Sequence, residues 1–275
     1  MRLSIKKIIT NFFYLLNRFI FFNKIFRIIA KISLSSIKSV NCGDFLLKFY
    51  TPNYVNDFRI STFFSKEPET INWINNFDNN STFLDIGSNI GIYSCYAAMK
   101  KSCRVYAIEP SVFNLELLSK NIYLNKLNDN IFIFPIALNN KNLISNFNMT
   151  STEWGGALST FNQKYTFDGS NFEDVFNYKT LGFGLDNLFD IFKLDYPKYI
   201  KIDVDGLESL ILEGGSKVFN LASEVLIEID DDHKDKKKYI ENFLKKHQFK
   251  LSEKSQSKLF ANSNYNKSFN QIWKK

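Results

Sequence analysis

The stretch that decides the fold is FLDIGSNIGIY, residues 83–93. Its apolar run carries the acid Asp85 near its end, and Gly87 and Gly91 then flank Asn89 ahead of a helical pattern. Glycine lets a backbone turn tightly and approach a ligand where a Cβ would collide. A ligand at this turn would meet backbone amides at the helix N-terminus, which suits either a dinucleotide or an adenosyl ligand.

The chain beyond this stretch alternates strand-like and helix-like segments. Strand-like runs lie at 82–86, 104–108, 131–136, 199–204 and 224–229, and helical stretches near 92–99, 112–124, 207–219 and 236–246. Such alternation predicts an α/β fold with a parallel sheet, right-handed crossovers and helices on both faces. Two further strands, near 249–253 and 269–274 with the polar loop 262–266 between them, are predicted to close a mostly parallel seven-stranded sheet as an antiparallel hairpin.

Three regions are expected along the chain. They are a basic amphipathic helical extension at 1–40, a lead-in layer at 41–80 and the main domain at 81–275. The lead-in layer is predicted to hold a short strand near 45–50 and a helix near 68–77. Glu67 and Glu69 would favour the start of that helix electrostatically.

The segment 139–186 breaks the alternation, because it is polar, aromatic and longer than a usual connection in such a sheet. Long excursions above strand ends are often lids or binding loops, so we expect this one to cover the acceptor. Trp154, beside Gly155 and Gly156, has two interpretations. Its ring either stacks on a sugar face of the acceptor or anchors the segment by packing.

The positive charge is concentrated at the N-terminal end. Of the net charge of +7, residues 1–40 contribute +8 through eight basic side chains and no acid, which leaves −1 for the rest. Nucleic-acid binding would spread basic charge over the folded body, so we expect no nucleic-acid partner. The chain has only two histidines, which leaves little to build a His-rich zinc site or a serine–histidine triad from, and no metal site is predicted.

The three cysteines, Cys42, Cys95 and Cys103, lack metal-ligand spacing and cannot all pair. They are typical of buried thiols in a reducing compartment, so a cytoplasmic protein is expected.

Residues 2–31 contain no Gly or Pro and are predicted to form one long helix. Its apolar stripe is Ile5, Ile8, Phe12, Leu15, Phe19, Phe22, Phe26 and Ile29. Arg18, Lys24 and Arg27 interrupt every window that could span a membrane, and no small-residue cleavage site marks a signal peptide. The helix is expected first to pack on its own domain or a partner. The alternative is that residues 1–31 lie on the anionic inner face of the membrane.

Two acids near the glycine turn separate the two candidate ligands. Counted from Gly87, the third and sixth positions are Asn89 and Ile92, so the dinucleotide fingerprint fails. S-adenosylmethionine carries a free ammonium, which Asp85 would complement. Glu109 ends the next strand 22 residues after Gly87, where it can accept both ribose hydroxyls, and Pro110 then stops that strand.

A second acidic constellation is KIDVDGLE, residues 201–208. Ligands of open α/β sheets lie beyond the carboxyl ends of the strands. We therefore expect Asp203, Asp205 and Glu208 to converge on the acceptor, either as a general base or as oxygen ligands of a cation. Alternatively, Asp205 and Glu208 simply begin the next helix with favourable charge.

Six segments between about residues 80 and 230 carry a family resemblance. They are LDIGSNIGIYS, VYAIEPSVFNLELLSKNIYLN, FPIAL, GLDNL, IKIDVDGLESLILEGG and VLIEID. In this order the chain resembles the FkbM methyltransferases, which implies a Rossmann-like class I methyltransferase fold with S-adenosylmethionine as cofactor. Two residues depart from the family's usual pattern: Ser88 replaces alanine and Asp205 replaces glutamate. Residues 1–60 lie outside the resemblance.

The resemblance also implies roles for single residues. Cofactor contacts are implied at Asp85, Gly87, Asn89, Gly91 and Glu109, to which we add the neighbouring Pro110. An active-site role is implied for Asp203, Asp205 and Glu208.

The implied acceptor atom is oxygen, so we expect methyl transfer to a hydroxyl of a sugar, glycolipid or related metabolite. The alternatives are a nicotinamide-dependent oxidoreductase and a non-catalytic scaffold bound to a membrane or partner.

Overall fold

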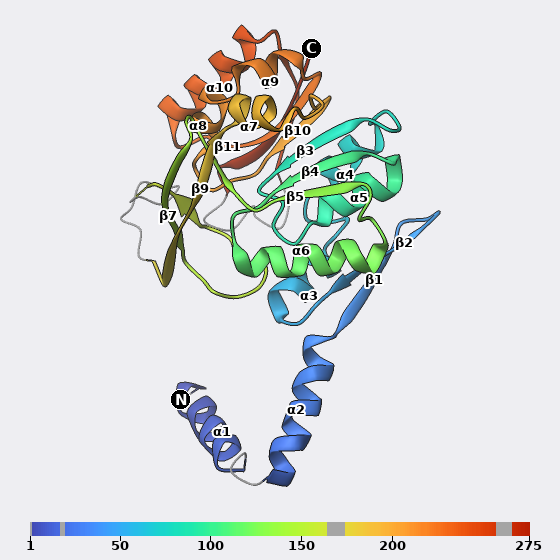
Figure 1. The fold of residues 1–275 in the computed structure, drawn as a ribbon, viewed down its shortest axis with the longest axis vertical. Helices are drawn as coiled ribbons and strands as arrows, with labels where there is room; N and C mark the ends of the chain where they lie inside the picture. Colours follow the sequence, from blue (N-terminus) through green and yellow to red (C-terminus); the bar gives the residue numbers. More distant parts are fainter. Residues whose placement is uncertain (1, 17–19, 164–173, 257–265) are drawn as a thin grey trace.

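The computed structural model describes residues 2–16, 20–163, 174–256 and 266–275 and centres on one twisted sheet (Figure 1). Its seven strands follow the order β12-β13-β11-β10-β3-β4-β5. The parallel strands are β3 (Thr82–Ile86), β4 (Arg104–Ile108), β5 (Ile131–Phe134), β10 (Tyr199–Ile202) and β11 (Glu224–Asp230). Antiparallel pairing of β13 (Ser268–Lys274) with β11 and with β12 (Lys250–Ser255) completes the sheet. The predicted, mostly parallel seven-stranded sheet is confirmed.

The order of the strands reverses between β3 and β10, because the chain first builds β4 and β5 on one side and then returns to build the other. In open α/β sheets a crevice opens at such a switch point, beyond the carboxyl ends of the strands. Both acidic motifs of the sequence lie at this crevice.

Helices cover both faces of the sheet, as predicted. On one side lie α4 (Pro68–Asn75), α5 (Ile92–Lys101) and α6 (Val112–Asn125), and on the other α7 (Leu185–Phe192), α8 (Glu208–Glu213), α9 (Ser216–Leu221) and α10 (Lys234–Lys246). Successive residues of a strand point to opposite faces of the sheet, so that Phe83 packs against the α4, α5 and α6 side and Leu84 against the α7 to α10 side. The single helix predicted at 207–219 is broken at Gly214, where a Cβ would lie 2.4 Å from the carbonyl oxygen of Asn139.

The lead-in layer contains more structure than predicted. β1 (Ile37–Asn41) pairs with β2 (Leu46–Tyr50), and α3 (Tyr54–Ser61) follows. Asn121 and Asn125 of α6 each accept a 2.9 Å hydrogen bond from the backbone of β2, which docks the layer on the domain. Since β1 already belongs to this layer, the helical extension ends at Leu34 and not at residue 40.

The extension is a pair of helices, α1 (Arg2–Leu16) and α2 (Ile20–Leu34), so the prediction of one long helix was wrong. Figure 1 shows them as a hairpin standing away from the body. The rings of Phe13 and Phe26 meet between the helices with centroids 5.4 Å apart. Phe19 and the side chain of Ile5, both in the predicted stripe, lie outside the described residues.

We expected this extension first to pack on its own domain or on a partner; packing on its own domain is contradicted, and packing on a partner stays a prediction. Among the described elements, neither α1 nor α2 makes an extensive contact with the body, whose two sheet faces are already covered by other helices. No helix in the described part of the chain combines the length and apolar character needed to cross a bilayer.

The segment 139–186, which we expected to be a lid or binding loop, contains strands, although its residues 164–173 lie outside the description. It contributes most of a small sheet, ordered β6-β9-β7-β8 and built from β6 (Ala137–Asn139), β7 (Leu143–Met149), β8 (Thr160–Phe161) and β9 (Phe176–Gly184). Phe147 and Phe161 of this sheet are buried in the main core. The polar and apolar residues of β7 alternate over 146–149, but before them apolar Ile144 is 68% exposed and polar Ser145 lies on the more buried side, which interrupts the pattern.

Candidate functional site

The glycine turn after β3 brings the two acidic motifs into contact. Gly87, Asn89 and Gly91 all adopt positive φ angles, of +79°, +50° and +81°. A Cβ on Gly87 would lie 2.0 Å from the backbone oxygen of Asp203, at the end of β10. Glycine is therefore required here by backbone conformation and by the close approach of a neighbouring strand.

Asp85 is buried on β3 and is paired in register with Lys201 on β10. Its Oδ2 accepts a 2.6 Å hydrogen bond from Ser94 Oγ, whereas its Oδ1 is buried with no partner in the described chain. Burial raises the pKa of Asp85, and the positive charge of Lys201 offsets part of that rise. A buried carboxylate oxygen without a donor is a site that a cationic or hydrogen-bonding ligand would satisfy.

Glu109 lies at the end of β4 with its carboxylate over the same turn. It accepts 2.8 Å hydrogen bonds from the backbone amides of Asn89 and Ser111. Burial raises its pKa to about 7, although those amides act in the opposite direction. Asn114 Nδ2 makes a third, longer contact of 3.4 Å with Glu109, which leaves about one of the roughly four acceptor positions of a carboxylate for a hydroxyl group. Pro110 faces the small sheet, where its carbonyl accepts a 2.5 Å bond from Tyr178.

The loop of Trp154 closes the crevice on the Glu109 side. The carbonyl of Gly156 accepts hydrogen bonds from Asn89 Nδ2 at 2.9 Å and from Asn114 Nδ2 at 3.1 Å. The Trp154 ring packs against the buried cluster of the α5 and α6 layer, and its Nε1 donates to Glu116 at 2.9 Å. These contacts agree with the interpretation of Trp154 as a packing anchor.

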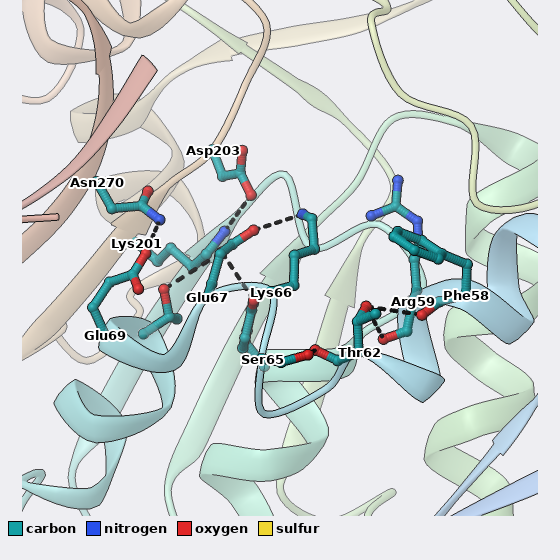
Figure 2. A network of polar contacts seen from close by, with 12 residues as sticks. Phe58, Arg59, Thr62, Ser65, Lys66, Glu67, Glu69, Lys201, Asp203 and Asn270 are labelled. Carbon is teal, nitrogen blue, oxygen red and sulfur yellow. Dashed lines mark hydrogen bonds and ion pairs between the residues drawn. The ribbon is translucent and has the colours of Figure 1, made fainter. Parts of the chain in front are cut away.

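A cavity lined by charged groups lies beside the turn, and we call it the polar cavity (Figure 2). The glycine turn, α5, the end of β10 and the lead-in layer line it. Its charged residues are the cations Arg59, Lys66 and Lys201 and the anions Glu67 and Asp203. Both signs of charge therefore line one cavity.

Lys201 and Asp203 form the ion pair at the centre of this cavity. Lys201 is 1% exposed, and its Nζ lies 2.7 Å from Asp203 Oδ2, while the Asp203 side chain remains 41% exposed. Burial opposes the charge of Lys201, but nearby acids, chiefly Asp203 and Asp85, outweigh it and raise its pKa. Burial likewise opposes the charge of Asp203, but Lys201 dominates and its pKa is lowered. Asp203 is therefore an ionised, solvent-reachable carboxylate.

Two residues of the lead-in layer enclose the pair. Glu67 accepts a 2.9 Å bond from the Tyr93 hydroxyl and forms a 2.6 Å ion pair with Lys66, which overcomes the cost of burial and lowers the pKa of Glu67. Arg59 donates to the carbonyl of Gly155 at 2.9 Å, while its Nε is buried with no partner among the described residues. The Nε of Arg59 is therefore a hydrogen-bond donor that a ligand in the cavity could use.

Sequence patterns did not identify Arg59, Lys66, Glu67 or Lys201. Glu67 was noticed only as a helix-starting acid, and Lys201 only as the first letter of a motif. A basic residue inside an otherwise apolar strand was the one available signal for Lys201.

The three acids of the second motif do not converge on one place, contrary to our expectation. Only Asp203 lines the polar cavity, whereas Asp205 and Glu208 line a second one together with Glu228. The chain reverses sharply at Gly206, whose φ is +93°, and Glu208 follows this turn.

Burial raises the pKa of both Asp205 and Glu208 to about 7, with repulsion from neighbouring acids adding to it. In the described residues, no group of three or more His, Cys, Asp or Glu side chains is arranged to hold a metal ion.

Comparison with known proteins agrees with this geometry. The model of the methyltransferase FkbM domain matches residues 85–251. No curated protein matches the chain.

Three solved structures are similar in fold. Precorrin-6y C5,15-methyltransferase from Geobacter metallireducens GS-15 is 11% identical over 76% of this chain and 86% of its own, with a TM-score of 0.44. M. jannaschii TYW2 in complex with AdoMet is 13% identical over 87% and 84%, with a TM-score of 0.46. M. jannaschii tRNA m1G37 methyltransferase is 14% identical over 83% and 54%, with a TM-score of 0.44. At such identities the likeness does not extend to what is methylated.

Proposed function

The chain belongs to the FkbM methyltransferase family, and from that premise we propose that it moves the methyl group of S-adenosylmethionine to a hydroxyl oxygen of a sugar, glycolipid or related metabolite. The observation that carries the proposal is the Asp203 carboxylate. It is ionised by Lys201 and partly exposed, and the backbone of the same residue lies against the glycine turn.

The residues at the crevice fit S-adenosylmethionine, which supplies an electrophilic methyl group when bound. Glu109 would accept a ribose hydroxyl, since its three protein donors leave about one acceptor position of the carboxylate free. Asp85, with its unpartnered Oδ1, and Glu67 would complement the ammonium of the amino-acid end. Arg59, with its unpartnered Nε, would complement the carboxylate of that end.

Arg59→Gln is therefore expected to weaken S-adenosylhomocysteine binding about tenfold, the usual effect of losing one charge-assisted hydrogen bond. Binding of 5′-methylthioadenosine, which has the same adenosine but no amino-acid end, should change little. Calorimetry with both ligands measures the difference. If both affinities fall equally, Arg59 supports the fold of the loop at Gly155 and does not hold the carboxylate.

Asp203 can serve the reaction without a raised pKa. The ionised carboxylate accepts a hydrogen bond from the acceptor hydroxyl and aims its oxygen lone pair at the methyl carbon. As the new C–O bond forms and the S–C bond breaks, the hydroxyl oxygen becomes positively charged and its proton becomes strongly acidic. Asp203 then takes that proton, so a weakly basic carboxylate is sufficient. Lys201 holds the carboxylate in place but does not touch the acceptor.

The function is tested by transfer of a radiolabelled methyl group. Protein and labelled S-adenosylmethionine are incubated with monosaccharides, nucleotide sugars and glycolipids, and the products are treated with mild alkali. A methyl ether survives this treatment, whereas a methyl ester releases its label as methanol. We expect alkali-stable label in a glycan or glycolipid fraction.

Label that is released as methanol would identify a carboxylate acceptor, and label found only in added RNA would identify a nucleic-acid acceptor. Either result would overturn the proposed acceptor while leaving the methyltransferase itself in place.

A further inference from the structure

The helices α1 and α2, which we call the N-terminal hairpin, leave a large apolar surface uncovered. Its exposed side chains include Ile8, Phe12, Tyr14, Phe21, Ile28 and Ile32, each between 56% and 70% exposed. Scattered single apolar residues on a protein surface need no explanation, but many large exposed apolar side chains on two short helices mark a binding surface. The hairpin stands away from the body of the protein, which therefore does not bury this apolar surface (Figure 1).

The charge of the hairpin restricts what can cover that surface. Residues 1–34 carry seven basic side chains and no acid, and Lys24, Arg27 and Lys31 of α2 are exposed. A second copy of the hairpin would bring two basic surfaces together with no acid to pair them, which is unfavourable. An anionic lipid surface provides acyl chains for the apolar side chains and negatively charged headgroups for the basic ones.

The length of the helices defines the mode of binding. Each has 15 residues, which corresponds to about 22 Å, whereas a bilayer's hydrocarbon core is about 30 Å thick. Neither helix can therefore span the core. Basic helices with large aromatic and aliphatic side chains instead lie in the interface, with the rings at the boundary between headgroups and acyl chains.

We propose that the N-terminal hairpin docks the protein on an anionic membrane surface by lying in its headgroup region. The hairpin leads directly into β1, where Lys38 Nζ lies 2.8 Å from Asp57 of α3. Arg59, which also belongs to α3, lines the polar cavity, so α3 connects the docked hairpin to that cavity. If the proposed function holds, such docking would place the crevice near acceptors confined to the membrane, but the docking itself does not depend on the acceptor.

The experiment is flotation of the full-length protein with lipid vesicles. Phosphatidylcholine vesicles with about 30% phosphatidylserine, at about 0.15 M salt, are compared with pure phosphatidylcholine. We expect binding to the anionic vesicles only. The triple variant Lys24→Gln, Arg27→Gln, Lys31→Gln should bind them at least about tenfold more weakly.

A matched control removes the same charge elsewhere. Lys234, Lys238 and Lys246 are exposed lysines of α10, and changing all three to Gln should leave vesicle binding within about twofold of the wild type. S-adenosylhomocysteine affinity should be unchanged in both triple variants, which shows that each has folded.

Three results would overturn the proposal. The first is that the wild-type protein does not bind anionic vesicles. The second is that the two triple variants lose vesicle binding equally. The third is that the wild type sediments as a dimer and only the α2 variant sediments as a monomer. Because no methyl acceptor is present, a negative outcome would not bear on the methyl transfer reaction.

Discussion

Replacing Gly87 by alanine is expected to abolish cofactor binding, lowering the affinity for S-adenosylhomocysteine by more than about a hundredfold. The new Cβ would lie 2.0 Å from the backbone oxygen of Asp203, and no side-chain rotation relieves a clash with backbone. A positive φ costs an L-residue about 1–2 kcal/mol, and overpacking adds about 1–3 kcal/mol. The turn must therefore move away from β10. Calorimetry and thermal unfolding measure the two effects.

Gly43→Ala separates strain from the clash. Gly43 has a similar φ of +87°, but nothing lies within 4 Å of a Cβ built there. In this control only the backbone strain should lower the free energy of unfolding, by about 1–2 kcal/mol, and the cofactor affinity should stay unchanged. If Gly87→Ala behaves in the same way, the contact between the turn and β10 is not what shapes the site.

Asp203→Asn is expected to lower the turnover number about 10²- to 10⁴-fold while cofactor affinity stays within a few-fold. The amide keeps the shape of the carboxylate and one acceptor oxygen, but it cannot take the proton of the acceptor hydroxyl. Lys201 would lose the negative charge of its 2.7 Å partner, but the acids Asp85 and Glu67 remain nearby to balance its positive charge. The variant should therefore still fold. Single-turnover kinetics with saturating cofactor measure the chemical step directly.

Asp205→Asn provides the matched control, since Asp205 lies only two residues away but lines the second cavity. We expect its turnover to change less than about tenfold. If both variants lose activity equally and a chelator abolishes wild-type activity until a divalent cation is returned, the acids coordinate a metal instead. Normal activity per folded molecule in Asp203→Asn would make that residue purely structural.

Several parts of the site could be predicted because they are local in sequence. The strand, turn and helix around Gly87 are encoded within a dozen residues, since apolar periodicity and glycine conformation act over short distances. Asp85 and Glu109 followed from their positions at the ends of such strands, and the structure places them on either side of the turn.

Other elements escaped prediction because their sequence patterns were weak or ambiguous. The small sheet of β7 and β9 was missed because the paired residues Ile144 and Leu181 are apolar but exposed, which interrupts the expected alternation in both strands. The N-terminal hairpin was predicted as one helix, because apolar spacing describes a helical face but not whether the chain folds back on itself.

What the sequence alone determined is thus the main strands and helices and the acids at the ends of β3 and β4, whose patterns depend on neighbours along the chain. Tertiary structure decided which charges meet. Lys201 faces Asp85 only because β10 pairs with β3 in one register, and Arg59 and Glu67 reach the polar cavity only because the lead-in layer docks on α6. These partners are brought together by strand register and by the packing of layers, which join segments distant in sequence and leave no periodic trace within either segment.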